Sequence, residues 1–126
     1  MVNKTHRVLL IDDDPMIRSW LREVFDTTEF ELLEAANGKE GIKQLAKGSV
    51  DLVITDIIMP EKEGIELIIE VRQEHGDIPI IAVSGGSHRG VDDYLQMAKK
   101  LGANMTLTKP FSADEILFSV KSFLGA

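Results

Sequence analysis

Polar side chains able to do chemistry follow four short apolar segments of this 126-residue chain. They are Asp12 and Asp13 after the first of these segments, then Asp56, Ser84 and Lys109 after the others. Two carboxylates about 4 Å apart repel by roughly 4 kcal/mol at an effective dielectric constant near 20, so acids that meet need a proton or a cation. Oxygen ligands without histidine or cysteine suit Mg²⁺, with Mn²⁺ as a substitute. A carboxylate beside Mg²⁺, a lysine and a hydroxyl can accept a phosphoryl group, because cations neutralise the charge on the transferred oxygens.

Each of these residues alone has an ordinary explanation. A strand-ending aspartate usually opens a loop, a serine after a strand usually forms a turn, and a lysine before a proline is usually exposed. Asp14 is set apart from the acidic pair, because it precedes Pro15 and is expected to cap a helix that starts there. The functional prediction therefore depends on the remaining residues meeting at one place.

Short apolar runs alternate along the chain with segments of helical spacing. Strands are expected at residues 8–11, 30–33, 52–54, 78–83 and 105–107, and apolar residues repeat at helical spacing after each of them. Strands that alternate with helices form βαβ units, which close right-handedly into a parallel sheet with helices on both faces. We therefore expect an α/β fold, a (βα)5 doubly wound three-layer sandwich. Ligands of such sheets bind beyond the carboxyl ends of the strands, where the polar side chains fall.

Two further helix boundaries are marked by local chemistry. The run Ser-Ala-Asp-Glu from Ser112 to Glu115 is a capping box, which predicts the start of the last helix. Gly102 is placed to end the fourth helix, because glycine adopts the left-handed conformation that often follows a helix.

Composition and charge narrow the class of protein. The length predicts one domain spanning residues 1–126, and the 44% hydrophobic and 28% charged content is typical of a soluble globular chain. A net charge of -7 and an isoelectric point near 4.9 disfavour direct binding to nucleic acid or to an anionic membrane. No cysteine occurs, and no apolar run is long enough for a signal sequence or a membrane span, so a cytoplasmic location is expected.

Four motifs in this order are specific enough to indicate a family. They are LLIDDDP at the first strand, TDIIMPEKEG around Asp56, IIAVSGG at the fourth strand and TLTKPF at the fifth. With them, residues 5–123 resemble the receiver domain of two-component response regulators. The resemblance implies a flavodoxin-like fold with strand order 2-1-3-4-5. It also implies a sensor histidine kinase or histidine phosphotransfer domain as phosphoryl donor, a downstream protein or an output domain as target, and a monomer or a weak phosphorylation-dependent dimer.

The resemblance assigns a role to each acidic residue. Asp56 would be the phosphoacceptor in a phosphorelay, and Asp13 and Asp56 would bind Mg²⁺ directly. Asp12 would act on the metal mostly through water, and Ile58 would contribute its backbone carbonyl. Such a protein catalyses only its own phosphorylation and dephosphorylation, so no turnover of a separate substrate is expected.

The same resemblance gives roles to residues at the other two strand ends. Ser84 would hydrogen-bond the phosphoryl group, and Lys109 would pair with it, with a cis peptide bond between Lys109 and Pro110. The backbone amides of Ile57 and Gly85 would contribute further hydrogen bonds.

One departure from the family and two of its variable positions bear on the switch. Thr106 stands where the family often has an aromatic residue linked to the conformational switch. Ile58 and Gly86 have side chains that cannot orient an attacking water. We therefore expect slow self-dephosphorylation, and an acyl-phosphate lifetime of only seconds would refute this expectation.

Two other functions compete with the phosphoacceptor. A phosphatase of the haloacid-dehalogenase type also forms an aspartyl phosphate, with Asp12 to Asp14 as its DxD motif, but Pro15 and the short chain argue against it. A receiver-like binding module that is never phosphorylated would not need the complete set of acids, serine and lysine. Labelling of Asp56 against Asp12 by a small phosphodonor discriminates between these functions.

Overall fold

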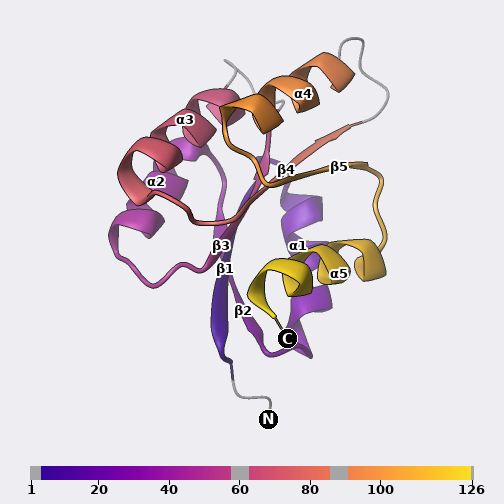
Figure 1. Cartoon of the computed structure of the whole chain (residues 1–126). Coiled ribbons are helices and arrows are strands. Elements are labelled where there is room, and N and C mark those ends of the chain that lie inside the picture. Colours follow the sequence, from indigo (N-terminus) through magenta and orange to yellow (C-terminus); the bar gives the residue numbers. More distant parts are fainter. Residues whose placement is uncertain (1–3, 58–62, 86–90, 126) are drawn as a thin grey trace.

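Strands alternate with helices along the whole chain in a computed structural model that describes residues 4–57, 63–85 and 91–125. The strands are β1 (His6–Ile11), β2 (Phe30–Ala35), β3 (Leu52–Asp56), β4 (Ile80–Gly85) and β5 (Met105–Lys109). The helices are α1 (Pro15–Asp26), α2 (Gly38–Ala46), α3 (Glu63–His75), α4 (Val91–Leu101) and α5 (Ala113–Leu124). All strands are parallel, in the order β2-β1-β3-β4-β5 (Figure 1), which confirms the expected (βα)5 fold and its strand order.

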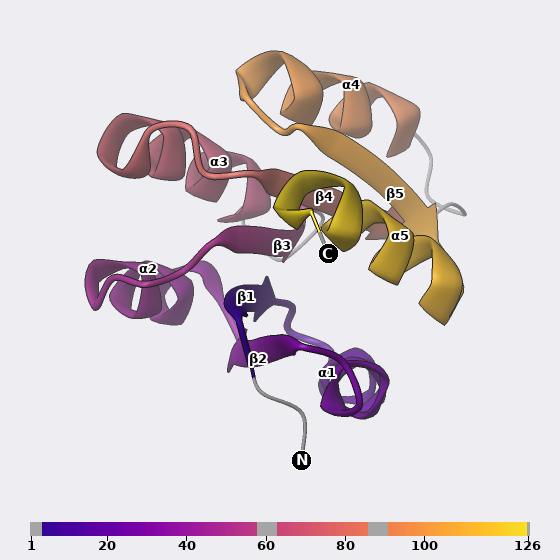
Figure 2. The same ribbon diagram turned by 60° about the horizontal axis from the view of Figure 1, so that its bottom comes forward.

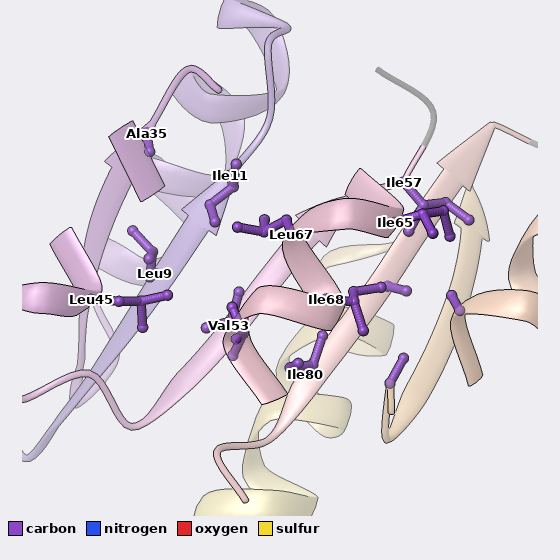
Figure 3. Close-up of a cluster of buried hydrophobic side chains, with 14 residues drawn as sticks. Leu9, Ile11, Ala35, Leu45, Val53, Ile57, Ile65, Leu67, Ile68 and Ile80 are labelled. Atoms are coloured by element: carbon purple, nitrogen blue, oxygen red, sulfur yellow. The ribbon is translucent and has the colours of Figure 1, made fainter. Parts of the chain in front are cut away.

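The sheet is covered on both faces, with α1 and α5 on one side and α2, α3 and α4 on the other (Figure 2). Successive side chains of a strand point to opposite faces, so each central strand contributes to two hydrophobic clusters. Leu9 and Ile11 of β1 join the cluster under α2, α3 and α4 (Figure 3), whereas Val8 and Leu10 join the cluster under α1 and α5. This double burial explains why the strands are apolar runs without a polar face.

The helix boundaries follow the predicted capping residues. Asp14 caps α1 by accepting a hydrogen bond from the Met16 amide, and Pro15 is the first helical residue. The capping box that starts at Ser112 is formed at α5. Gly102 follows the last residue of α4 with a φ of +130°, as expected of a glycine that ends a helix. None of the described helices is both long and apolar enough to cross a membrane.

Strands β2 to β5 extend beyond the predicted apolar runs at their carboxyl ends, whereas β1 ends at Ile11 as predicted. In the ladders, Asp56 pairs with Val83, Ser84 pairs with Thr108, and Gly85 pairs with Lys109. The polar residues therefore belong to the strands and not to the loops that follow. The ladder hydrogen bonds between neighbouring strands therefore fix the backbone of these residues, including Lys109 on the edge strand β5, which pairs with β4.

Candidate functional site

The site lies at the carboxyl ends of β1, β3, β4 and β5, and Lys109 is at its centre. The Lys109 Nζ atom donates hydrogen bonds to Asp12 Oδ2 at 2.9 Å and to Asp56 Oδ2 at 3.0 Å. These residues come from β5, the end of β1 and β3, so their meeting depends on the strand order. The structure thus brings together the acids and the lysine that the sequence predicted. The peptide bond between Lys109 and Pro110 is cis, as predicted.

Asp13 joins the two carboxylates that bind this lysine. Asp12, Asp13 and Asp56 each offer an oxygen, and these oxygens lie within 4.8 Å of one another. Asp12 and Asp56 are buried, with exposed fractions of 2% and 7%, whereas Asp13 is exposed. The grouping offers only carboxylate oxygens, which is the ligand type that Mg²⁺ prefers.

The charge of Lys109 is set by two opposing effects. Burial by itself lowers the pKa of its ammonium group, but hydrogen bonds and charge from Asp12 and Asp56 outweigh burial, so the pKa is raised above its usual value. Lys109 therefore carries its positive charge throughout the neutral range. One ammonium group faces three carboxyl groups, and this imbalance favours binding of a divalent cation.

Asp12 is held at each of its polar atoms. Its amide donates to the Ala35 carbonyl at 3.1 Å, and its Oδ1 accepts from the Asp14 amide at 2.9 Å. Its Oδ2 accepts from Lys109, and its backbone carbonyl accepts from Arg18 Nη1 at 2.7 Å. Sequence pattern does not single out Arg18, because an arginine at this place on a helix has the pattern of an ordinary exposed cation.

Ser84 brings an unsatisfied hydroxyl to the same edge of the sheet. It is fully buried, and within the described part of the chain its Oγ has no hydrogen-bond partner. It follows Val83, which lies opposite Asp56 in the ladder between β3 and β4. A buried polar group without a partner costs about 1 to 3 kcal/mol. Such a cost is expected where a bound group completes the hydrogen bonding.

The backbone amide of Ile57, one of the donors expected at the phosphoryl group, already makes a hydrogen bond within the sheet. The Ile57 amide donates to the Val83 carbonyl at 3.0 Å, so the sheet uses this donor here, and its contact with a phosphoryl group stays a prediction. The ladder between β3 and β4 continues one residue past Asp56 and uses this donor. Ile58 and Gly86 lie outside the described residues, and the role of the Gly85 amide stays a prediction.

The start of α3 presses against the end of β3. A Cβ atom at Gly64 would fall on the Asp56 carbonyl oxygen and the Ile57 Cα, well inside the 3.0 Å that real Cβ contacts keep. Only glycine lets the helix approach the strand this closely. The helix therefore supports the backbone that carries the Asp56 side chain.

Comparisons with known proteins agree with this geometry. The family described as the response regulator receiver domain matches residues 8–121, and this chain belongs to that family. The chain is 34% identical over 118 residues to the sporulation initiation phosphotransferase F of Bacillus subtilis, which covers 94% of this chain and 93% of that relative. The solved receiver domain of the Francisella response regulator 1452 has a TM-score of 0.84 and 27% identity, covering 96% of this chain and 98% of that one.

Other relatives are longer. The transcriptional regulatory protein CpxR of Klebsiella pneumoniae is 34% identical over 119 residues, which cover 94% of this chain but only 49% of that relative. The chain therefore spans about half the length of the transcriptional regulators that it matches. The family makes the chain a receiver domain of two-component signalling.

Proposed function

We propose that this receiver domain accepts a phosphoryl group on the Asp56 carboxylate, from a phosphohistidine of a sensor histidine kinase or of a histidine phosphotransfer domain. The observation that supports this most directly is the ammonium group of Lys109, which bridges Asp12 and Asp56 at 2.9 and 3.0 Å beside the unsatisfied hydroxyl of Ser84. The relative named as a phosphotransferase supports the same reaction class.

The chain's own residues divide the work of the transfer. An oxygen of Asp56 attacks phosphorus, the bond from phosphorus to the donor histidine breaks, and the released imidazole takes up a proton. Lys109 neutralises charge on the transferred oxygens, and the Ser84 hydroxyl donates a hydrogen bond to one of them.

The acidic residues fit a magnesium ion. Asp13 and Asp56 would bind it directly, Asp12 would act through water, and the Ile58 carbonyl, which lies outside the described residues, would complete the protein ligands. When bound, Mg²⁺ supplies positive charge that stabilises the phosphoryl oxygens. The exposed carboxylate of Asp13 is accessible to the ion from solvent.

The contacts and burial of Asp12 argue against it as the acceptor. Both carboxylate oxygens of Asp12 already accept hydrogen bonds, one from the Asp14 amide and one from Lys109, and its side chain is only 2% exposed against 9% for Asp56. A nucleophile must reach its substrate, so these contacts argue against the phosphatase in which Asp12 is attacked.

The test uses acetyl phosphate and Mg²⁺, with the phosphoryl group counted by intact mass and located by peptide mapping. The wild-type chain and an Asp26→Asn control, which alters an exposed aspartate at the end of α1, should each retain one phosphoryl group. The Asp56→Asn variant should retain none. Rapid turnover with label on Asp12 would support the phosphatase instead, and a folded wild-type chain that takes up no phosphoryl group would support the unphosphorylated binding module.

The wider role is also a proposal. We take residues 1–126 as a single receiver domain that turns over no separate substrate, works in the cytoplasm and acts on a downstream protein or on an output domain. The relatives support both forms of output, since one matches this chain along nearly its whole length and others are twice as long.

A further inference from the structure

Arg18, on the second turn of α1, reaches back to the acidic site. Its Nη1 atom donates to the backbone carbonyl of Asp12 at 2.7 Å, and its side chain is only 20% exposed. That carbonyl belongs to the planar peptide unit that joins Asp12 to Asp13. A hydrogen bond that fixes this oxygen also fixes the direction in which the chain enters Asp13.

The orientation of Asp13 depends on this backbone hydrogen bond, because its own side chain is not held by the described residues. No hydrogen bond or ion pair of its side chain is found within the described residues, and the side chain is exposed. Asp12 is held at all its polar atoms, and among the described residues Arg18 provides the hydrogen bond to the peptide unit shared by both acids.

Arg18 is itself held by an acid on β2. The Arg18 Nε lies 3.8 Å from Glu34 Oε1. Arg22 binds the same carboxylate, donating from Nε to Oε2 at 2.7 Å and from Nη2 to Oε1 at 2.8 Å. The Glu34 side chain is 21% exposed, so this pairing is partly shielded from water. Glu34 thus restrains the guanidinium of Arg18, and Arg22, one helical turn further along, holds Glu34 in turn.

We propose that Arg18 is a positioning residue for cation binding, because its guanidinium, restrained by Glu34, fixes the peptide unit between Asp12 and Asp13 and so presents their carboxylates to the ion. This inference rests on the proposed function of the acidic site. Groups that orient metal ligands from outside commonly change metal affinity by about 10- to 100-fold when they are removed.

The direction in which the Mg²⁺ affinity changes when Arg18 is removed distinguishes a positioning role from a purely electrostatic one. Arg18 is a cation near the site, so by Coulomb's law its removal alone should make Mg²⁺ bind more tightly. Loss of positioning should make Mg²⁺ bind more weakly. Arg18→Lys separates the two effects further, because it keeps the charge and loses the fork that lets one side chain bond to Asp12 and approach Glu34 together.

The experiment is a titration of the apo protein with MgCl₂, followed by amide chemical shifts in NMR. Arg7→Met is the matched control, because Arg7 is an exposed arginine of β1 that pairs with Glu31 of β2 and takes no part in holding Arg18. Arg18→Met should raise the Kd for Mg²⁺ by about 10-fold, Arg18→Lys by a smaller factor, and Arg7→Met by less than about twofold. Phosphorylation by acetyl phosphate should need correspondingly more Mg²⁺ in the Arg18 variants and reach a near wild-type rate at saturation.

Three results would overturn the inference. These are unchanged or tighter Mg²⁺ binding by Arg18→Met, unchanged binding by Arg18→Lys, or equal weakening by Arg18→Met and Arg7→Met. Arg18→Lys keeps the test open if the methionine variant does not fold. Failure of the proposed function looks different, because the wild-type chain itself would then take up no phosphoryl group on Asp56.

Discussion

Replacing Lys109 by methionine tests whether one ammonium group holds two buried carboxylates together. Lys109 Nζ lies 2.9 Å from Asp12 and 3.0 Å from Asp56, and its side chain is 20% exposed. The two aspartates have carboxylate oxygens within 4.8 Å of each other, so without the ammonium they repel by about 3.5 kcal/mol at an effective dielectric constant near 20. Breaking a buried ion pair costs about 3 to 5 kcal/mol, and the partial exposure of Lys109 reduces this to about 2 to 3 kcal/mol.

The assay is urea unfolding followed by far-UV circular dichroism, in buffer with EDTA and again with saturating Mg²⁺. Lys109→Met should lose about 2 to 3 kcal/mol of unfolding free energy without Mg²⁺ and recover part of it with Mg²⁺, because the more negative site binds the cation more tightly. Lys39→Met, at an exposed position of α2, controls for the loss of one charge and should change stability by less than about 0.5 kcal/mol. An equal loss with and without Mg²⁺, or no loss at all, would refute this account of the site.

Two further predictions concern the same edge of the sheet. Gly64→Ala should lower stability by about 1 to 3 kcal/mol in urea unfolding and slow phosphorylation, because its Cβ overlaps the Asp56 carbonyl oxygen; helix propensity alone predicts a gain, so a more stable variant would contradict the close contact. The raised pKa of Lys109 means that its ionic contribution is complete below the usual lysine value of 10.5 and is lost as the pH rises through the higher folded-state pKa. The stability difference between the wild-type chain and Lys109→Met should therefore stay constant from neutral pH to about pH 9 and shrink only in more alkaline buffer, and an earlier decline would count against the lysine's role.

The order and type of the elements could be predicted from the sequence because each central strand is buried on both faces. That burial produces apolar runs, and the runs end at the first polar side chain. The hydrogen-bond ladder between strands does not stop at a polar side chain, because it needs only backbone N–H and C=O groups. It continues through Asp56, Ser84 and Lys109. Hydrophobic pattern therefore located the carboxyl ends of β2 to β5 too early, and only β1 ends where its apolar run ends.

The amino end of β4 was predicted too early for a related reason. The apolar run begins at residue 78, but Pro79 has no N–H to donate to a ladder, and the strand begins at Ile80. The Ile78 carbonyl accepts a hydrogen bond from Arg72 of α3 instead. An apolar residue can thus extend a pattern without belonging to the strand.

The site was predictable to the extent that it depends on side-chain chemistry at strand ends. Contacts that use backbone atoms were not, because residue type does not reveal them. The bond from Arg18 to the Asp12 carbonyl and the use of the Ile57 amide by the sheet both belong to this class. Such contacts follow from the register of the strands and the position of α1, which sequence pattern alone does not give.

The β1 and β4 sides of the site differ in whether their hydrogen bonds are already made. This difference limits where phosphorylation can contribute free energy. On the β1 side the hydrogen bonds of Asp12 are already made before phosphorylation. Lys109 already pairs with the Asp56 carboxylate, so on phosphorylation it contributes only the difference between its interaction with an acyl phosphate and its interaction with a carboxylate. Ser84 on β4 has an unsatisfied hydroxyl, and a hydrogen bond to a charged group contributes about 1.5 to 3 kcal/mol. Moving a two-state element from 1:99 to 99:1 takes about 5.5 kcal/mol. Ser84 alone therefore cannot drive a complete switch, and the remainder has to come from further donors near the phosphoryl group or from the partner that binds the switched form.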